Sequence, residues 1–163
     1  MMAAFKARHV ANSLLQRGFK EARSDMSPMK IQKLMFYLNG WHLAMHGTRA
    51  IDISFEPWRF GPVVPLIYDD LKCFGSSSVN RYISEHDPVS GEMKPYVVNS
   101  ACEAFYEVLD IVWEKYIGIN AINLSAMTHE PGSPWDQAIK EGLSEIPEDK
   151  TQAYFEALAR TPS

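Results

Sequence analysis

The stretch SPMKIQKLMFYLNGWHLAMHG, residues 27–47, predicts the clearest helix of the chain. Ser27 is a good N-cap, and Pro28 suits the first helical position because its missing amide hydrogen would have no partner there anyway. Apolar residues then recur at steps of three and four, as they do on one face of a helix. Gly47 takes the C′ position, where glycine commonly ends a helix.

Lys30 and Lys33 fall in the first turns of this helix, on the side opposite its apolar stripe. The amino end of a helix carries partial positive charge, so two cations are placed slightly unfavourably there. We interpret both lysines as part of an exposed, well-solvated face, where such charges cost little.

The segments on either side also predict mostly helix. Residues 4–17, ended by Gly18, carry a narrow apolar stripe, which places that helix on the rim of the core. Ser100 and Glu103 form a capping box for a long helix over residues 100–117. Shorter helices are expected at 65–74, from Asn120 or Asn123 to Met127, from Ser133 and Pro134 to near Gly142, and from Pro147 onward.

Extended structure is expected in only two places. Residues 50–59 alternate weakly, which predicts a short strand, and residues 96–98 are expected to pair with 51–55. The segment 76–96 is rich in turn signals. The chain is therefore predicted to be mainly α, a single compact helical domain over residues 1–163 with at most a small β-ribbon.

The overall composition is that of an ordinary globular protein. Of the 163 residues, 46% are hydrophobic and 22% are charged, unlike a disordered chain. With 16 basic and 20 acidic residues the net charge is −4, so a general affinity for nucleic acid is not expected. No signal peptide and no membrane-spanning run is found, which predicts a cytoplasmic protein. Cys73 and Cys102 are then expected to be buried free thiols.

The segment FEPWRFGPVVP, residues 55–65, is unusually rich in aromatic and conformationally restricted residues. It contains three residues of types that contribute strongly to binding, followed by a turn-forming pair. These five residues are Trp58, Arg59, Phe60, Gly61 and Pro62. Aromatic side chains serve equally well as core anchors, so the sequence leaves open whether this segment is core or interface.

Signals for a metal site are weak. His42 and His46 have the spacing of a zinc-binding helix, but the residues between them lack the glutamate of H-E-x-x-H. We interpret His42 as packed and His46 as facing solvent. Asp69 and Asp70 are helical neighbours that point about 100° apart, so they do not converge on one ion.

The segment THEPGSPW, residues 128–135, holds the one candidate acid–base cluster. Thr128, His129 and Glu130 are polar neighbours, and a histidine with a carboxylate can transfer protons. No nucleophile or phosphate-binding loop accompanies them, so we interpret them as the end of one helix before the cap of the next. We expect no catalytic, cofactor or metal site.

Three blocks of the sequence occur in an order that marks a known family. They are SPMKIQKLMFYLNGWHLAMHG (27–47), FEPWRFGPVVPLIYDDL (55–71) and LSAMTHEPGSPW (124–135). Together they resemble the Panacea domain, whose members include SocA-like antitoxins and GepA-like phage-associated proteins. Each block alone is weak, but jointly they are specific. Pro57 and Ile31 depart from the family's alanine and leucine without removing a polar group.

The resemblance implies a helical domain that acts as the antitoxin of a two-gene toxin–antitoxin system. Relatives neutralise unrelated toxins by direct protein binding and are common in prophages, and at least one resembles an adaptor that delivers its toxin to an energy-dependent protease. The expected partners are a toxin encoded nearby and, as a further candidate, such a protease. The family core is expected at about residues 5–142, followed by a C-terminal helix at about 147–160.

Residues that match the shared motifs, together with the aromatic turn, are the candidates for a common scaffold or partner-binding site. They are Lys30, Lys33, Trp58, Arg59, Phe60, Gly61, Pro62, Pro65, Tyr68, Thr128, His129 and Trp135. Specificity for one toxin is expected to come from surface loops such as 76–95.

Two other functions stay open on the sequence. The chain could be a DNA-binding autoregulator with Lys30 and Lys33 on phosphates, although the net charge opposes unaided binding. It could instead be an enzyme that uses His129 with Glu130 or Asp69, which requires those side chains to meet in one cleft.

Overall fold

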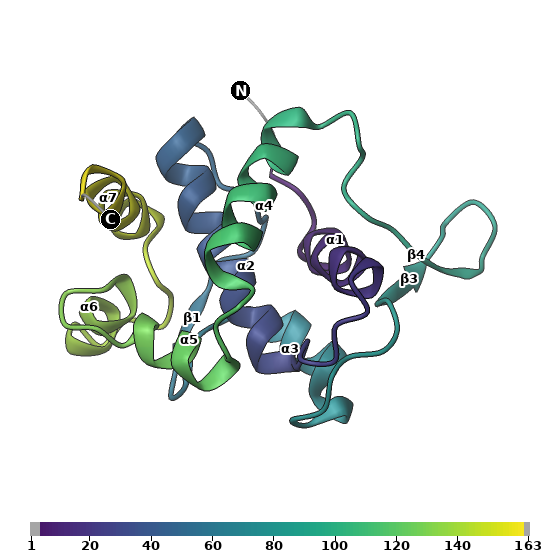
Figure 1. Ribbon diagram of the computed structural model, residues 1–163, viewed down its shortest axis with the longest axis horizontal. Helices are drawn as coiled ribbons and strands as arrows, with labels where there is room; N and C mark the ends of the chain where they lie inside the picture. The colour runs from purple at the N-terminus through teal and green to yellow at the C-terminus, as the bar shows by residue number, and fades with distance from the viewer. Residues whose placement is uncertain (1–3, 162–163) are drawn as a thin grey trace.

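Helix α2 (Pro28–His46) occupies the centre of the protein, and the other helices pack around it (Figure 1). The computed structural model describes residues 4–161. Fourteen of the 19 residues of α2 are buried, so the helix is enclosed on nearly all sides. Its ends are as predicted: Ser27 Oγ accepts a hydrogen bond from Lys30 N at 3.3 Å, and Gly47 adopts a φ of 73°.

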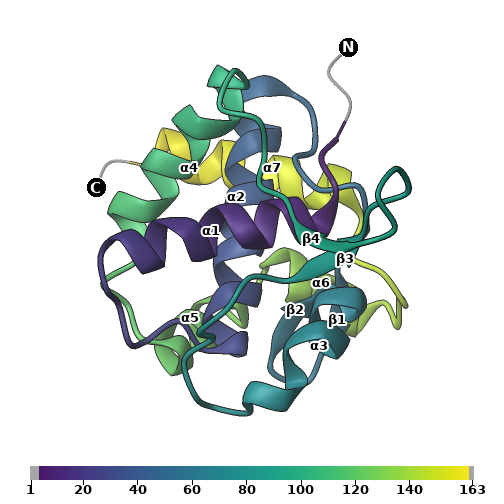
Figure 2. The same ribbon diagram turned by 90° about the vertical axis from the view of Figure 1, so that its right-hand side faces the viewer.

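Helices α1 and α7 lie on opposite sides of α2 in both ribbon views, and two small hairpins complete the described part of the chain (Figures 1 and 2). The remaining helices and strands are α1 (Ala7–Lys20), β1 (Glu56–Trp58), β2 (Gly61–Val63), α3 (Pro65–Leu71), the 3₁₀ turn η1 (Lys72–Phe74), β3 (Ser84–His86), β4 (Met93–Pro95), α4 (Glu103–Tyr116), α5 (Ala121–Thr128), α6 (Pro134–Lys140) and α7 (Glu148–Arg160). The predicted fold class, mainly α with a small amount of β-ribbon, is confirmed. None of the described helices combines the length and apolar character needed to cross a membrane.

Helices α2 and α7 pack closely at Gly40 of α2, which lies against the ring of Phe155 on α7. A β-carbon at Gly40 would lie 2.1–2.5 Å from three atoms of that ring, so glycine is required for the two helices to pack at this distance. Phe155 is fully buried, and Phe36 and Trp41 meet its ring edge to face at centroid distances of 5.8 and 5.4 Å. The C-terminal helix therefore belongs to the same aromatic core as α2.

Buried amide side chains of the helices hold the irregular segments in place. Asn12 on α1 donates to the carbonyl oxygens of Ile83 and Tyr96 at 2.8 and 2.9 Å and accepts from Ile83 N at 2.8 Å. Asn39 on α2 accepts from Ala50 N at 2.9 Å. These bonds satisfy backbone groups that have no helical or strand partner, which is why long connections can lie against the core.

The strand pairing differs from the prediction. Residues 96–98 do not pair with 51–55; instead β1 pairs with β2 and β3 pairs with β4, each as a two-stranded antiparallel hairpin. Of the strand predicted at 50–59, residues 56–58 form β1, whereas Ile51 forms only an isolated bridge with Phe5. Strand pairing depends on contacts distant in sequence, which weak alternation does not specify.

Several predicted helix details are also wrong. Gly18 lies inside α1, where a β-carbon would approach Met26 Cγ to 2.9 Å, so this glycine serves packing and does not end the helix. Eight residues of α1 are buried, which places it in the core instead of on its rim. Helix α4 begins after Cys102 without a side-chain cap, so the capping box at Ser100 does not form. The two thiols are free, but Cys73 is exposed and Cys102 only partly buried.

Candidate interaction surface

The aromatic turn predicted at residues 55–65 is the β1–β2 hairpin, whose tip carries Arg59 and Phe60. Gly61 follows the tip with a φ of 115°, a backbone conformation that favours glycine. A β-carbon there would lie 2.6 Å from Thr128 Oγ1 and 2.7 Å from Lys33 Cε. Glycine is thus required both for the turn and for the close approach of the hairpin to α2 and α5.

Side chains from three helices hold the hairpin by its backbone carbonyls. Trp135 Nε1 on α6 donates to the oxygen of Trp58 at 2.7 Å, and Ser125 Oγ on α5 donates to that of Phe60 at 2.5 Å. On α2, Lys33 Nζ donates to Pro62 O at 3.1 Å. The hairpin is therefore fixed on several sides, so the side chains at its tip are presented on a rigid support.

Gln32 on α2 adds a paired contact just beyond the hairpin. Its side-chain amide donates to Val64 O at 3.0 Å and accepts from Val64 N at 2.9 Å, so both polar groups of that buried residue are satisfied. Neither Gln32 nor Ser125 was among the predicted site residues. Both lie inside the family-like blocks, one residue before Lys33 and one after Leu124, and this position is the only sequence signal that singles them out.

The corner between α5 and α6 brings the predicted Thr128, His129 and Trp135 together. Thr128 is buried, and its hydroxyl donates to Ser125 O at 2.6 Å. The rings of His129 and Trp135 lie 4.0 Å apart. Burial first, and then the positive charge of Lys33, keep the pKa of His129 below its ordinary value, while a hydrogen bond with the backbone of Arg59 opposes them.

The acid–base partners proposed for His129 do not gather around it. Glu130 is exposed on the surface after α5. Asp69 is paired with Lys72 at 3.6 Å on the surface of α3, and Asp70 is paired with Arg8 at 2.8 Å. His129 instead lies against the β1–β2 hairpin and the α6 tryptophan.

The two lysines of α2 are not exposed, contrary to the prediction, because other segments cover the helix at their positions. Lys30 and Lys33 each retain only 1% of their accessible surface. Lys30 Nζ contacts Asp25 Oδ2 at 2.8 Å and Ile117 O at 2.6 Å, whereas Lys33 contacts the β1–β2 hairpin. Of the candidate residues, Lys30 alone points away from the hairpin, toward the end of α4.

The hairpin and the start of α2 border a groove with a volume of about 390 Å³. Its lining is mainly apolar and includes Met29, Lys33, Trp58, Phe60 and Tyr68. Phe60 and Tyr68 remain 57% and 44% exposed, which is high for aromatic side chains of a monomeric protein. None of the residues that line the groove is acidic.

Trp58 is half-buried and lies at the surface, outside the main hydrophobic core. Its ring is half-buried, meets Tyr68 edge to face at 4.9 Å and donates from Nε1 to Glu56 Oε1 at 2.9 Å. The same ring forms part of the groove wall. A second hollow shares Met29 and Gly75 with the groove and carries Ile122, which is 77% exposed. The two hollows are therefore neighbours on the surface.

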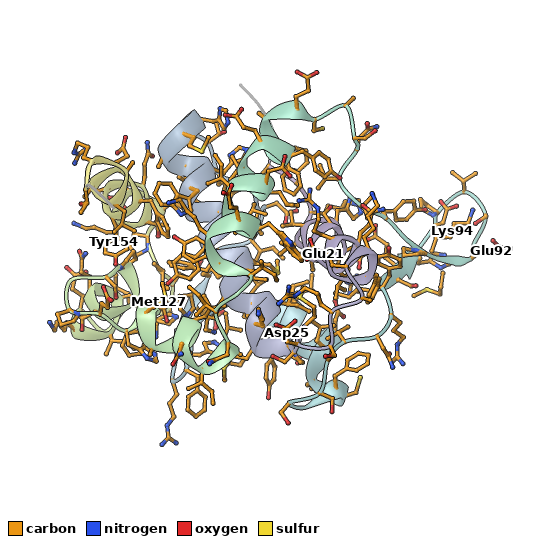
Figure 3. All side chains as sticks on the ribbon, in the orientation of Figure 1. Glu21, Asp25, Glu92, Lys94, Met127 and Tyr154 are labelled. Atoms are coloured by element: carbon orange, nitrogen blue, oxygen red, sulfur yellow. The ribbon has the colours of Figure 1, made fainter. Side chains whose placement is uncertain are left out.

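The predicted specificity loop lies elsewhere on the molecule. Residues 76–95 include the β3–β4 hairpin, whose Glu92 and Lys94 project far from Met127 on α5 (Figure 3). Val89 and Met93 on this hairpin are 93% and 63% exposed. Apolar side chains are therefore exposed on the β3–β4 hairpin as well as beside the groove.

Comparisons with known proteins match most of this architecture. A family model described as "Antitoxin SocA-like, Panacea domain" matches residues 31–136, which include the hairpin and most of the groove. Antitoxin SocA of Caulobacter vibrioides (strain NA1000 / CB15N) is 33% identical over 136 residues, 80% of this chain and 68% of that protein. No solved structure matches the chain.

Proposed function

The chain belongs to the SocA-like antitoxins with a Panacea domain, and on that premise we propose that it neutralises a toxin, encoded nearby, by direct protein–protein binding. The surface that binds the toxin is the groove beside the β1–β2 hairpin. The observation that supports the proposal is that two aromatic side chains remain exposed beside the groove: Phe60, on a hairpin that side chains of α2, α5 and α6 hold rigid, and Tyr68 on the adjacent helix α3. Exposed aromatic residues on a rigid support lose little entropy on binding, so they contribute strongly to affinity.

The motif residues support this assignment by their distribution. Gly61, Pro62, Thr128 and Trp135 build the hairpin and its anchors, while Phe60 and Tyr68 face the groove. The first set maintains the platform, and the second supplies the contact surface. The β3–β4 hairpin, with its exposed Val89 and Met93, is the proposed place for additional contacts that select one toxin.

Burial of the two lysines argues against the DNA-binding alternative. That function depended on Lys30 and Lys33 reaching phosphates from an exposed helix face, and each is 99% removed from solvent by other segments. Neutralisation by binding also requires no catalysis, so it needs no partner for His129. Of the functions considered, toxin binding therefore uses the observed surface most directly.

Co-expression with the product of the neighbouring gene tests the proposal. We expect the chain to restore growth and to form a complex that survives size-exclusion chromatography. Phe60→Ala should abolish both, whereas Ile139→Ala, which truncates an apolar residue of similar exposure on α6, should change neither. Growth arrest that persists although both proteins are well expressed would refute the proposal.

The same strain tests the proteolytic role that the family resemblance implies. If the chain also delivers its toxin to an energy-dependent protease, the half-life of the toxin should fall only when the chain is present. A half-life unchanged or lengthened by the chain would leave neutralisation by binding alone.

A further inference from the structure

Two lysines one turn apart on α2 are equally buried but differ in how their charge is compensated. Lys30 Nζ forms an ion pair with Asp25 at 2.8 Å and a second hydrogen bond to Ile117 O at 2.6 Å. Lys33 Nζ has one partner, the neutral carbonyl of Pro62 at 3.1 Å. Within residues 4–161, no carboxylate oxygen lies within 4.0 Å of the Lys33 ammonium group.

A buried ammonium group with one carbonyl partner is an expensive feature of a fold. It has three hydrogen-bond donors, and removing its charge from water destabilises the folded state unless an opposite charge compensates. Burial accordingly lowers the pKa of Lys33 to about 8. An apolar side chain of similar length would avoid this cost, so the charge is better explained by a partner than by the stability of the fold.

The surroundings of Lys33 contain a second unfilled polar position. His129 Nε2 is buried without a hydrogen-bond partner. Burial is the main cause that lowers the pKa of this histidine, and the nearby positive charge of Lys33 is the second. Gly61, which lacks a side chain, leaves Lys33 Cε and Thr128 Oγ1 directly beside its α-carbon. Two nitrogen groups thus lie near one another, and no carboxylate of residues 4–161 is paired with either of them.

The side chain that carries this charge is part of the groove wall, and its ammonium group lies beneath the surface against Pro62 O. Lys33 is one of the residues that line it, Arg59 is another, and no acidic residue is among them. The groove is therefore basic and otherwise apolar on a protein whose net charge is −4. Such a surface is complementary to an apolar segment that carries one negative charge.

We propose that the groove receives an apolar segment of the toxin and that an aspartate or glutamate side chain of this segment pairs with Lys33. This inference rests on the proposed function, because it names the chemistry of the partner at the same groove. A side-chain carboxylate is favoured over a chain terminus because Lys33 is only 1% exposed. A carboxylate on a methylene stem extends away from its own backbone, whereas a terminal carboxylate is attached directly to the bulkier backbone, so the side chain is the better fit to a buried ammonium group.

The first test replaces the lysine and measures affinity for the toxin by calorimetry. Lys33→Met should weaken binding by roughly 30-fold or more, because the toxin carboxylate would be buried without a partner. Its thermal midpoint should stay at or above that of the wild type, which separates a lost contact from a damaged fold. Lys72→Met, which removes one exposed positive charge, is the matched control and should bind normally. Normal binding by Lys33→Met would overturn the inference while leaving the proposed function intact.

A double-mutant cycle then identifies the carboxylate. Each Asp and Glu of the toxin is changed to its amide, and each variant is measured against both wild type and Lys33→Met. For one acidic residue, the change to the amide should weaken binding of the toxin to the wild type. The same change should weaken binding to Lys33→Met hardly at all. If no toxin side chain is coupled to Lys33, or if the coupled group is the toxin's C-terminal carboxylate, the inference is wrong.

A small-molecule arm tests the site without any toxin, and so decides the inference even if the proposed function fails. Here 4-phenylbutyrate, an aromatic tail with a carboxylate, is titrated into the full chain with ¹³Cε-labelled lysines and compared with 4-phenylbutyramide. The acid should shift the Lys33 resonance and raise its pKa, and the amide should do neither. Equal effects of acid and amide, or none at Lys33, would overturn the carboxylate assignment.

Discussion

Replacing Lys33 by methionine should change how the stability of the protein depends on pH. The pKa of Lys33 in the folded chain is about 8, against 10.5 for a freely solvated lysine. Between these values the unfolded chain binds more protons than the folded chain, so the free energy of unfolding contributed by this residue rises with pH. Below pH 8 both states are protonated, and the full cost of burying the charge is present.

The size of the effect follows from the same two values. The gap between 10.5 and about 8 corresponds to roughly 3 kcal/mol of destabilisation at pH 7. Methionine removes that cost, but it also gives up the hydrogen bond to Pro62 O, which is worth about 1 kcal/mol. Lys33→Met should therefore be more stable than the wild type by about 2 kcal/mol at pH 7.

Urea denaturation at several pH values from 7 to 10.5 measures this difference. The advantage of Lys33→Met should shrink as the pH rises, whereas Lys72→Met, an exposed lysine, should follow the wild type throughout. Tyrosine ionisation affects all three proteins alike, so it cancels in the comparison. A variant less stable than the wild type at pH 7, or a difference independent of pH, would refute the assignment of Lys33 as an uncompensated buried charge.

Three further substitutions test packing and surface. Gly40→Ala should destabilise the fold by about 1–3 kcal/mol, because the added methyl meets the ring of Phe155; unchanged urea stability would contradict the α2–α7 packing. Gly61→Ala should cost about 2–3 kcal/mol in thermal melts, through its φ of 115° and the contact with Thr128, and a neutral effect would argue against the tight hairpin. Phe60→Ala should stay within about 0.5 kcal/mol of the wild type yet lose toxin binding at least tenfold; a large loss of stability would assign this ring to the core.

Local signals in the sequence predicted three helix starts, one of them as a choice between Asn120 and Asn123. Ser27, Asn120 and Ser133 each cap a helix through a side-chain oxygen, as their positions before helical segments indicate. The two glycines 18 and 47 show the limit of such signals. Both follow an apolar stripe, but Gly47 ends its helix, while Gly18 lies within α1 because Met26 packs against it. That contact joins separate segments and cannot be read from either one alone.

At the candidate site, too, the sequence indicated which residues take part but not how separate segments pack around them. The motif blocks contain Trp58, Gly61, Thr128 and Trp135, which are distant in sequence and lie together at the hairpin in the structure. The groove itself was not foreseen, because it depends on which faces of α2 and α3 remain uncovered once the hairpin has packed. A pattern of residue types indicates which residues can form a surface. Whether their side chains are exposed depends on which other segments pack over them.

The two lysines of α2 show most clearly that segments outside a helix decide the exposure of its side chains. On the sequence they are identical, a turn apart in one helix, and both were assigned to a solvated face. In the fold both are buried, and they differ in the partners that other segments supply. Lys30 Nζ donates to Asp25 and to Ile117 O, whereas among the described residues Lys33 Nζ donates to Pro62 O only. Helix α2 carries no acidic residue, so a compensating charge for either lysine comes from another segment or, as we propose for Lys33, from another molecule. For Lys30 the chain supplies it, and for Lys33 the neighbouring groove leaves room for a partner to do so.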